Sequence, residues 1–337
     1  MAFRSSLLVL FLLSLIAFPL LSNGEISEGL AKKIKSINAR GAHYGLVVSG
    51  EAELNVFLAV GVFQPVDISG RRFHVGMFRG SRTILVMSGS GSVNAAQTTQ
   101  LLLTHFRVKG VIHYGRAASA NPKYLRVGDV AIPSQFAHTA VWYWQKFRRD
   151  EGSFDHQIAN LTFSDFNVDK NVLNFLQSVY LQPETVYSKP EEGDSIFWFN
   201  ADDNLYATAE KIEDVELDRC LFKSLICLPK QPKIKRIERA SSADIYLNNE
   251  AYRNFLHKEL NVGSIDTETA AIAMVCESEK AAFLAMRSIT NYAGGPSLEN
   301  DVSVIKKLWT SHASVAVGAI FDKLAPGDST LRLVNSK

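Results

Sequence analysis

The sequence has few cysteines and no surplus of charge of either sign. Three cysteines occur in 337 residues, and no cysteine or histidine spacing resembles a metal site. The 36 basic and 34 acidic residues leave a net charge of +2, so charge alone implies no polyanionic partner. Basic residues gather between Lys230 and Arg239, where most alternate with apolar ones, a pattern typical of a solvated strand face. We therefore expect no metal site and no nucleic-acid partner.

A long apolar run occurs only at the N-terminus. Arg4 precedes the run Leu7–Leu21, which is interrupted by Pro19, and the small residues Ser22–Gly24 follow as at a signal-peptidase site. An uncleaved membrane anchor needs about 20 apolar residues, and this run is shorter. We therefore expect a signal peptide over residues 1–24 and no membrane contact after its removal. The secretory pathway would deliver the chain to the cell exterior or the vacuole.

Secretion changes how the cysteines are interpreted. Cys220 and Cys227 lie in a predicted insertion, Asp218–Pro232, and can close a small surface loop as a disulfide. Cys276 falls on the apolar side of a predicted helix, where we expect a buried thiol. The triplet that begins at Asn160 (Asn-Leu-Thr) is a glycosylation sequon that the secretory route can use, although such triplets are common by chance.

Apolar runs and helical patterns alternate along most of the chain, which predicts an α/β fold. The expected strands are Tyr44–Val48, Gly70–Met77, Thr83–Met87, Lys109–Tyr114, Val127–Pro133, Ile234–Glu238, Val262–Ile265 and Ala281–Met286. The expected helices are Glu25–Arg40, Ser92–Phe106, Asn171–Tyr180, Ala207–Ile212, Thr269–Cys276 and Val302–Leu324. The pattern loosens around residues 148–232, which we interpret as an insertion into a single domain over residues 25–337.

Polar side chains follow two of these strands at the point where each strand ends. Asp266 and Glu268 come after one strand, and the cluster Arg287–Asn291 comes after the next. In an open α/β sheet, ligands bind beyond the carboxyl ends of strands. The spacing therefore predicts Glu268 and Asn291 at neighbouring strand ends, in a small-molecule site.

Three further features leave two interpretations open. Glu53 is either a helix N-terminal charge that complements the macrodipole or a carboxylate aimed at a site. The turn that begins at Gly89 can present backbone N–H groups to an anion or a sugar. It lacks the dinucleotide fingerprint, because Asn94 stands where the third glycine is required. Trp142 and Trp144 belong either to a pocket or to the core or a subunit interface.

Four motifs occur in the order seen in the nucleoside phosphorylase/nucleosidase superfamily, which includes purine nucleoside phosphorylases, uridine phosphorylases and methylthioadenosine nucleosidases. The motifs are Ser88–Leu102, Val127–Val130, Asp266–Glu268 and Arg287–Asn291. The resemblance spans residues 43 to 323. The leader, the segment Ala137–Trp142 and the cysteine insertion are similar to the plant branch of bark storage and wound-inducible storage proteins.

The resemblance implies a three-layer α/β/α fold with a central mixed sheet that is partly barrel-like. It implies a small-molecule nucleoside as ligand, a homo-oligomer and no cofactor, with phosphate as a possible co-substrate. The implied reaction is cleavage of the N-glycosidic bond of purine nucleosides. The alternative is a plant storage or nucleoside-binding protein that kept the fold and lost turnover.

The resemblance also implies roles for particular residues. Glu268 matches the glutamate that binds the ribose hydroxyls, and Thr267 replaces the methionine that packs under the ribose. Glu53 matches the carboxylate that activates water. Tyr246 matches an aromatic residue that stacks on the base, although it can also be a core residue, and Leu247 would contact the base through its backbone.

Two departures from the family pattern bear on catalysis. Asn291 stands where the nucleosidases have the aspartate that protonates the base; an amide can donate a hydrogen bond to N7 or O6 but cannot transfer a proton. The expected anion or phosphate turn, formed by Gly89, Gly115, Arg116 and His113, carries an arginine that either binds phosphate or fills the site. Glu53 favours water as the nucleophile and Arg116 favours phosphate, so hydrolysis and phosphorolysis both stay open.

Overall fold

The chain separates into two compact units, with the boundary in sequence between residues 41 and 42. The computed structural model describes residues 26–145, 158–163, 178–221, 226–295 and 305–325. The expected signal peptide lies outside these residues. The first unit contains helix α2 (Glu28–Ala39), which confirms the helix expected there. The Ser27 hydroxyl caps it by accepting the Leu30 N–H at 3.3 Å, which satisfies one of the free donors of the first turn.

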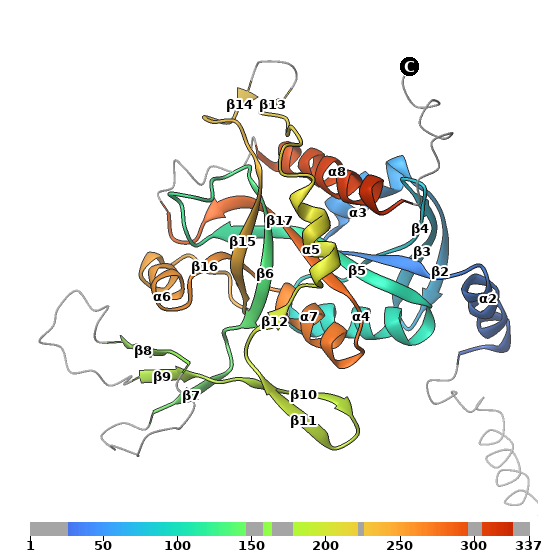
Figure 1. Cartoon of the computed structure of the whole chain (residues 1–337), viewed down its shortest axis with the longest axis horizontal. Coiled ribbons are helices and arrows are strands. Elements are labelled where there is room, and N and C mark those ends of the chain that lie inside the picture. Colours follow the sequence, from blue (N-terminus) through green and yellow to red (C-terminus); the bar gives the residue numbers. More distant parts are fainter. Residues whose placement is uncertain (1–25, 146–157, 164–177, 222–225, 296–304, 326–337) are drawn as a thin grey trace, which may run out of the picture. The chain divides into compact units, whose positions relative to one another are not determined.

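The second unit is built on a ten-stranded mixed sheet, as expected from the sequence (Figure 1). Its strands are β1 (His43–Val48), β2 (Val62–Ile68), β3 (Arg71–Phe78), β4 (Ser81–Met87), β5 (Val108–Ser119), β6 (Val130–His138), β12 (Phe199–Asn200), β15 (Ile234–Ser242), β16 (Val262–Asp266) and β17 (Phe283–Tyr292). Pairing runs β5–β17–β6–β15–β16 and returns to β5, so these five strands form a closed ring. From β5, the strands β1, β4, β3 and β2 extend as an open sheet.

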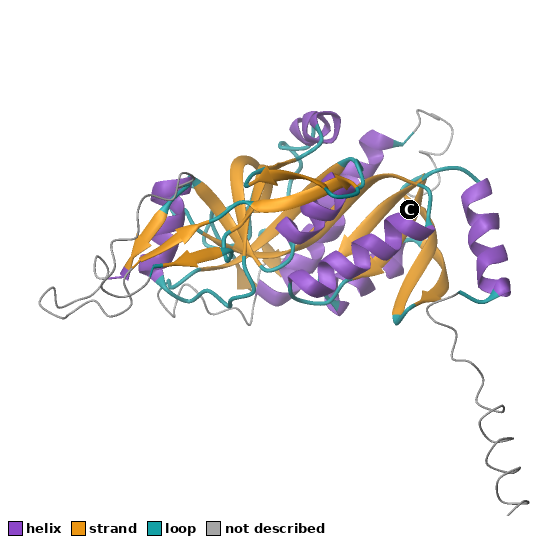
Figure 2. Cartoon of the chain, turned by 90° about the horizontal axis from the view of Figure 1, so that it is seen from below, coloured by secondary structure: helices purple, strands orange, loops and turns teal. Residues whose placement is uncertain are grey.

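Helices cover both sides of the strands (Figures 1 and 2). They are α3 (Glu51–Val60), α4 (Ser92–His105), α5 (Asp203–Glu210), α6 (Glu250–Leu260), α7 (Thr269–Ser278) and α8 (Ile305–Leu324). Helices α3 and α8 pack together, as do α4 and α7, while α6 packs on β16. Central strands such as β1 and β17 are buried along almost their whole length, because both of their faces are covered. No helix within the described residues is long and apolar enough to cross a bilayer.

Smaller sheets lie outside the main one. Strands β7 (Trp142–Trp144), β8 (Asn160–Thr162) and β9 (Ser178–Leu181) form one of them, and β10 (Glu184–Lys189) forms a hairpin with β11 (Glu192–Ile196). We expected a helix over residues 171–180. The structure describes only residues 178–180 of this range, and they lie in strand β9, so the prediction is wrong there. Val179 and Leu181 are buried on either side of Tyr180, which is the period-two pattern of a strand.

Strand β2 was missed because its residues are mostly polar or exposed, without a clear apolar period. The basic residues of β15 are each paired with an acceptor of the same chain. Lys235 contacts Asp129 at 2.8 Å and Arg236 contacts Glu213 at 3.0 Å. Their charges are thus balanced within the fold, in agreement with the interpretation of this stretch as a strand face.

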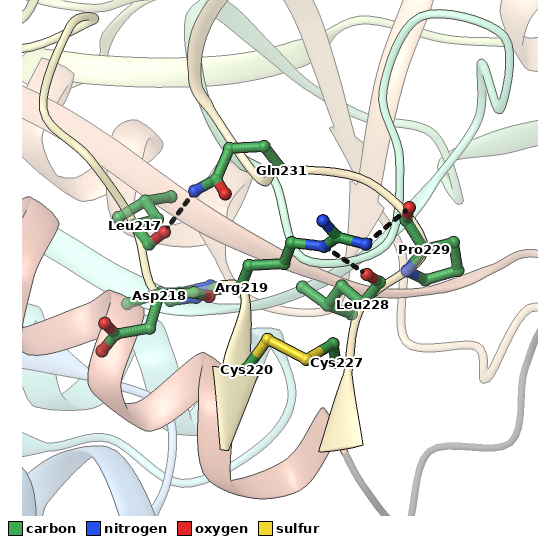
Figure 3. Close-up of a disulfide and its surroundings, with 9 residues drawn as sticks. Leu217, Asp218, Arg219, Cys220, Cys227, Leu228, Pro229 and Gln231 are labelled. Atoms are coloured by element: carbon green, nitrogen blue, oxygen red, sulfur yellow. Dashed lines mark hydrogen bonds between the residues drawn. A yellow bond between two sulfur atoms is a disulfide. The ribbon is translucent and has the colours of Figure 1, made fainter. Parts of the chain in front are cut away.

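Cys220 and Cys227 form a disulfide between the short strands β13 (Cys220–Leu221) and β14 (Ile226–Cys227) (Figure 3). Beside it, the Arg219 guanidinium donates to the carbonyl oxygens of Leu228 at 2.9 Å and Pro229 at 3.4 Å. Leu228 packs with Leu308 of α8 in a small apolar cluster. The disulfide therefore closes a loop that is also anchored on α8.

Replacing both cysteines by serine (Cys220→Ser with Cys227→Ser) should lower the free energy of unfolding by about 2.5 kcal/mol, because the bond limits the unfolded chain over a short loop. Urea unfolding with and without a thiol reductant measures this. The reductant should destabilise the wild type and leave the double variant unchanged. An equal effect of the reductant on both proteins would contradict a stabilising bond.

Candidate functional site

A cavity of about 360 Å³ opens beyond the carboxyl ends of β5, β16 and β17, next to the segment that follows β15. Its position agrees with the general placement of ligand sites in α/β sheets. Six residues predicted for the site line it: Arg116, Tyr246, Leu247, Thr267, Glu268 and Asn291. Four other predicted residues are not part of its lining: Glu53, Gly89, His113 and Gly115.

Arg287 lies beneath the cavity and has no exposed surface. Its Nη2 is 2.9 Å from Asp266 Oδ1 and 3.2 Å from Glu268 Oε2. Its Nε donates to the Thr269 hydroxyl oxygen at 2.7 Å, and its Nη1 donates to the Ser49 hydroxyl oxygen at 3.2 Å. A buried guanidinium requires such partners, because an unpaired buried charge is strongly destabilising.

Asp266 connects Arg287 to the start of α7. Its carboxylate accepts the backbone N–H groups of Glu268 at 2.9 Å and Thr269 at 2.8 Å, and the Ser242 hydroxyl at 2.7 Å. Burial opposes ionisation of this carboxyl group. The Arg287 guanidinium and the hydrogen bonds from Thr269 and Ser242 outweigh burial and hold the pKa of Asp266 below its usual range. Asp266 is therefore a structural anion that fixes the peptide carrying Glu268.

Glu268 is held from both sides in the cavity wall and is 4% exposed. Its Oε1 accepts the Gly91 N–H at 3.1 Å and the Thr267 hydroxyl. Its Oε2 accepts from Arg287 at 3.2 Å and from the Ser49 hydroxyl at 3.4 Å. Four donors thus fix the carboxylate, and the two hydroxyls among them can rotate away when a ligand hydroxyl arrives.

In the glycine turn before α4, two backbone N–H groups already donate hydrogen bonds to carboxylates of the chain itself. Gly91 has φ 92°, a conformation that favours glycine, and its N–H binds Glu268. The Ser92 N–H donates to Asp244 Oδ1 at 2.7 Å, and the Ser92 hydroxyl donates to the other oxygen of Asp244. These two N–H groups at the N-terminus of α4 are therefore occupied. Gly89 also has positive φ, at 86°, and shapes the turn from outside the cavity lining.

Glu53 lies in the first turn of α3 and is completely buried. Neither of its carboxylate oxygens accepts a hydrogen bond from the described residues. Arg116 Nε lies 3.7 Å from Glu53 Oε1, and the Arg116 guanidinium is stacked 4.5 Å above the ring centre of Trp309. Burial raises the pKa of Glu53, against the opposing effect of Arg116 and Arg287. The Glu53 carboxyl group thus combines an elevated pKa with an ion-pair partner, Arg116, from the cavity lining.

The cavity lining also includes Tyr246, Leu247 and Asn291, which offer it aromatic, apolar and amide groups. Tyr246 is 91% exposed, so it stands at the cavity mouth and is not a core residue. The Asn291 side-chain oxygen accepts the Thr290 hydroxyl at 3.2 Å. This bond leaves the amide nitrogen as the donor that Asn291 can offer to a ligand.

The expected anion turn around Gly115 is wrong, because β5 continues through Gly115 and Arg116 to Ser119. A Cβ atom on Gly115 would lie 2.0 Å from Arg287 Nη1 and 2.3 Å from the Ser49 hydroxyl oxygen. The glycine makes room for the buried guanidinium. His113 points into the core: its Nδ1 is 2.9 Å from the Val47 carbonyl oxygen, and burial together with Arg287 lowers its pKa to about 3.

Sequence reasoning missed the parts played by Ser49, Asp244 and Arg287. The sequence did offer a signal for Arg287: it is an arginine at the end of the apolar run that follows the Asp266-x-Glu268 pair along the chain, so it could have been predicted as their partner. Asp244 binds Ser92 across 152 residues, and no local pattern predicts that contact.

Trp142 and Trp144 do not line the cavity. Within the described part of the chain, no group of three or more His, Cys, Asp or Glu side chains is arranged to hold a metal ion.

The substitution Gly115→Ala should reduce the free energy of unfolding by at least about 3 kcal/mol, since the new methyl group must displace Arg287 from its two carboxylates. Gly110→Ala is the matched control in the same strand, because its Cβ atom would meet only ordinary contacts of 3.5 Å or more. Chemical unfolding of both variants measures the difference. Equal stability of the two variants would contradict the role given to Gly115.

Similar proteins include plant storage proteins and bacterial nucleosidases. Bark storage protein A of Populus deltoides is 34% identical over 282 residues, which are 81% of this chain and 88% of that protein. The 5'-methylthioadenosine/S-adenosylhomocysteine nucleosidase of Bacillus velezensis is 27% identical over 236 residues, or 70% of this chain and 78% of that protein.

Two solved structures from Helicobacter pylori have the same fold. The native futalosine hydrolase aligns with a TM-score of 0.59 at 19% identity, over 85% of this chain and 99% of that one. A mutant 5'-methylthioadenosine/S-adenosylhomocysteine nucleosidase with 5'-methylthioadenosine in its active site aligns with a TM-score of 0.59 at 22% identity, over 84% and 99%. The sequence profile of the phosphorylase superfamily matches residues 43–325, nearly all of the second unit. The chain therefore belongs to the phosphorylase superfamily.

Proposed function

We propose that this chain hydrolyses the N-glycosidic bond of purine nucleosides, with water as the nucleophile. The observation that carries the proposal is that the groups able to bind a phosphate already face carboxylates of the chain. The Gly91 and Ser92 N–H groups bind Glu268 and Asp244. Arg116 faces Glu53. A phosphate dianion would enter beside these carboxylates and be repelled, whereas a neutral water would not.

The ribose would lie against Glu268 and Thr267. A carboxylate accepts two hydroxyls well, and Glu268 is already oriented by Arg287 and Gly91. As the glycosidic bond breaks, positive charge develops on the sugar ring. A fixed carboxylate in a partly water-excluded wall stabilises that charge in the transition state more than it stabilises the neutral substrate.

The base would lie between Tyr246 and Asn291. Tyr246 offers a ring at the cavity mouth on which a purine can stack, and Leu247 adds an apolar surface. The Asn291 amide can donate a hydrogen bond to N7 or O6 without transferring a proton. A 6-oxopurine leaves more readily than adenine without protonation at that site, so we propose inosine-type nucleosides as the preferred class.

Glu53 would be the base that accepts a proton from water. It does not line the cavity, but Arg116 reaches from the cavity lining to it. A displacement of the Arg116 side chain would give water access to the Glu53 carboxylate. This requirement, together with the missing acid at Asn291, predicts slow turnover.

A second candidate is a storage or nucleoside-binding protein with no turnover. Two observations favour it: the 34% identity to a bark storage protein, and a Glu53 carboxylate that is buried away from the cavity lining. For either function we propose the same route through the cell, with a signal peptide over residues 1–24, secretory delivery and assembly as a homo-oligomer.

Recombinant protein beginning at residue 25 should release free base from inosine faster than from adenosine, and added phosphate should not increase the rate. Glu268→Gln should reduce nucleoside binding and turnover together, since the ribose loses its charged acceptor. Glu277→Gln, on the same helix but outside the cavity, is the control. Phosphate-dependent release would indicate phosphorolysis. Nucleoside binding without base release would favour the storage or binding protein.

The pH dependence of kcat/KM tests Glu53. A base acts when deprotonated and burial raises the pKa of Glu53, so the rate should rise with pH through a midpoint above the ordinary glutamate value of about 4.3. Glu53→Gln should remove this rise. Arg116→Gln should move the midpoint to higher pH, because the guanidinium lowers the Glu53 pKa.

Arg72→Gln removes an exposed arginine that is paired with Asp67, and it should leave the pH profile unchanged. A profile that is the same in the wild type, Glu53→Gln and Arg116→Gln would contradict the role of Glu53 as the base.

A further inference from the structure

The outer face of the small sheet β7–β9–β8 carries a row of three side chains. Asn160 of β8 is directly opposite Tyr180 of β9, and Tyr180 is opposite Tyr143 of β7. Directly opposed residues in antiparallel strands have their side chains on the same face of the sheet. The two tyrosine rings are 6.3 Å apart, so they form a continuous aromatic ridge that begins beside Asn160.

The other face of the same sheet is packed inward over most of its area. Leu161, Val179 and Leu181 are buried, and Trp142 packs with them in one apolar cluster. Trp144, opposite Val179 on this face, is half exposed. Because side chains alternate along a strand, Asn160 and the two tyrosines project from the opposite face, where both tyrosines are partly exposed. Asn160 is exposed, in keeping with this arrangement.

Asn160 also begins the sequence's only Asn-x-Ser/Thr triplet. Its side-chain nitrogen lies 3.4 Å from the Thr162 hydroxyl, and the two residues share a face because they are two positions apart. A hydroxyl two residues after the asparagine is what the glycosylation sequon requires. The residue with the required sequence is thus also exposed and next to its hydroxyl partner.

We propose that Asn160 carries an N-linked oligosaccharide whose innermost sugar lies on the ridge formed by Tyr180 and Tyr143. The donor is a lipid diphosphate-linked oligosaccharide. The Asn160 amide nitrogen forms a bond to C1 of the first sugar, the C1–O bond to the diphosphate breaks, and the amide proton leaves to the medium as the lipid diphosphate departs.

The tyrosine ridge suits the apolar face of a pyranose ring. The faces of aromatic rings carry partial negative charge, and the axial C–H groups of a sugar carry partial positive charge, so the two stack favourably. A sugar attached to Asn160 reaches Tyr180 first, since these residues are opposite each other in the sheet. The oligosaccharide covers this outer face, which keeps it out of contact between copies of the chain.

The full chain with its own leader, secreted from cultured mammalian cells, tests the attachment. Its intact mass should fall by one oligosaccharide after treatment with peptide-N-glycosidase. Asn160→Gln and Thr162→Ala should have the bare polypeptide mass, whereas Thr162→Ser preserves the sequon and should keep the sugar. A wild-type chain that has only the mass of the polypeptide, whether secreted or retained, overturns the proposal.

The rate at which the glycosidase releases the sugar from the folded protein tests the ridge. Tyr180→Ala should be deglycosylated several-fold faster than the wild type, because the bond between Asn160 and the first sugar loses its cover. Tyr187→Ala removes an exposed tyrosine of the separate β10–β11 hairpin and should have the wild-type rate. Equal rates in all three proteins would overturn the placement of the sugar on the tyrosines.

Discussion

Arg287 is a fully buried guanidinium placed between the carboxylates of Asp266 and Glu268. Burying such a cation is strongly unfavourable unless charged and polar partners surround it, and breaking a buried pair typically costs about 3–5 kcal/mol. The surrounding residues meet that requirement. Gly115 leaves space for the side chain, and the hydroxyls of Ser49 and Thr269 accept its remaining hydrogen bonds. Together with the Gly91 N–H, this buried charge cluster holds Glu268 in the cavity wall.

The same arrangement bears on which ligands the cavity would accept under the proposed function. Three carboxyl groups, those of Glu53, Asp266 and Glu268, lie beside the two guanidinium groups of Arg116 and Arg287. A fourth, that of Asp244, accepts from Ser92 at the adjoining turn. This excess of acidic groups disfavours an anionic co-substrate and suits a neutral sugar whose ring becomes positive during bond cleavage. The α4 N-terminus, a common anion site, is used here to hold the protein's own carboxylates. These charges support the proposal that water, not phosphate, is the nucleophile.

Much of the fold could be predicted from the sequence, because β1 and the first half of β17 are short apolar runs. The cavity lies where polar residues follow these runs. Glu268 and Asn291 were expected together and do line one cavity. Glu53 lies in the first turn of α3, which agrees with its interpretation as a helix N-terminal charge. It is not part of the cavity lining and is 3.7 Å from Arg116, so its role as a site carboxylate stays a prediction. Gly115 was misinterpreted as part of a turn. A glycine is needed there because the Arg287 side chain, from another strand, passes too close for a Cβ atom.

The most direct test of hydrolysis by this cavity is the fate of labelled water. Inosine is incubated with the protein in water enriched in heavy oxygen, with phosphate present, and the sugar product is analysed by mass spectrometry. Hydrolysis predicts free ribose with one heavy oxygen at C1, at a yield that Glu268→Gln reduces. Formation of ribose 1-phosphate without the label at C1, or no sugar product at all, would contradict it.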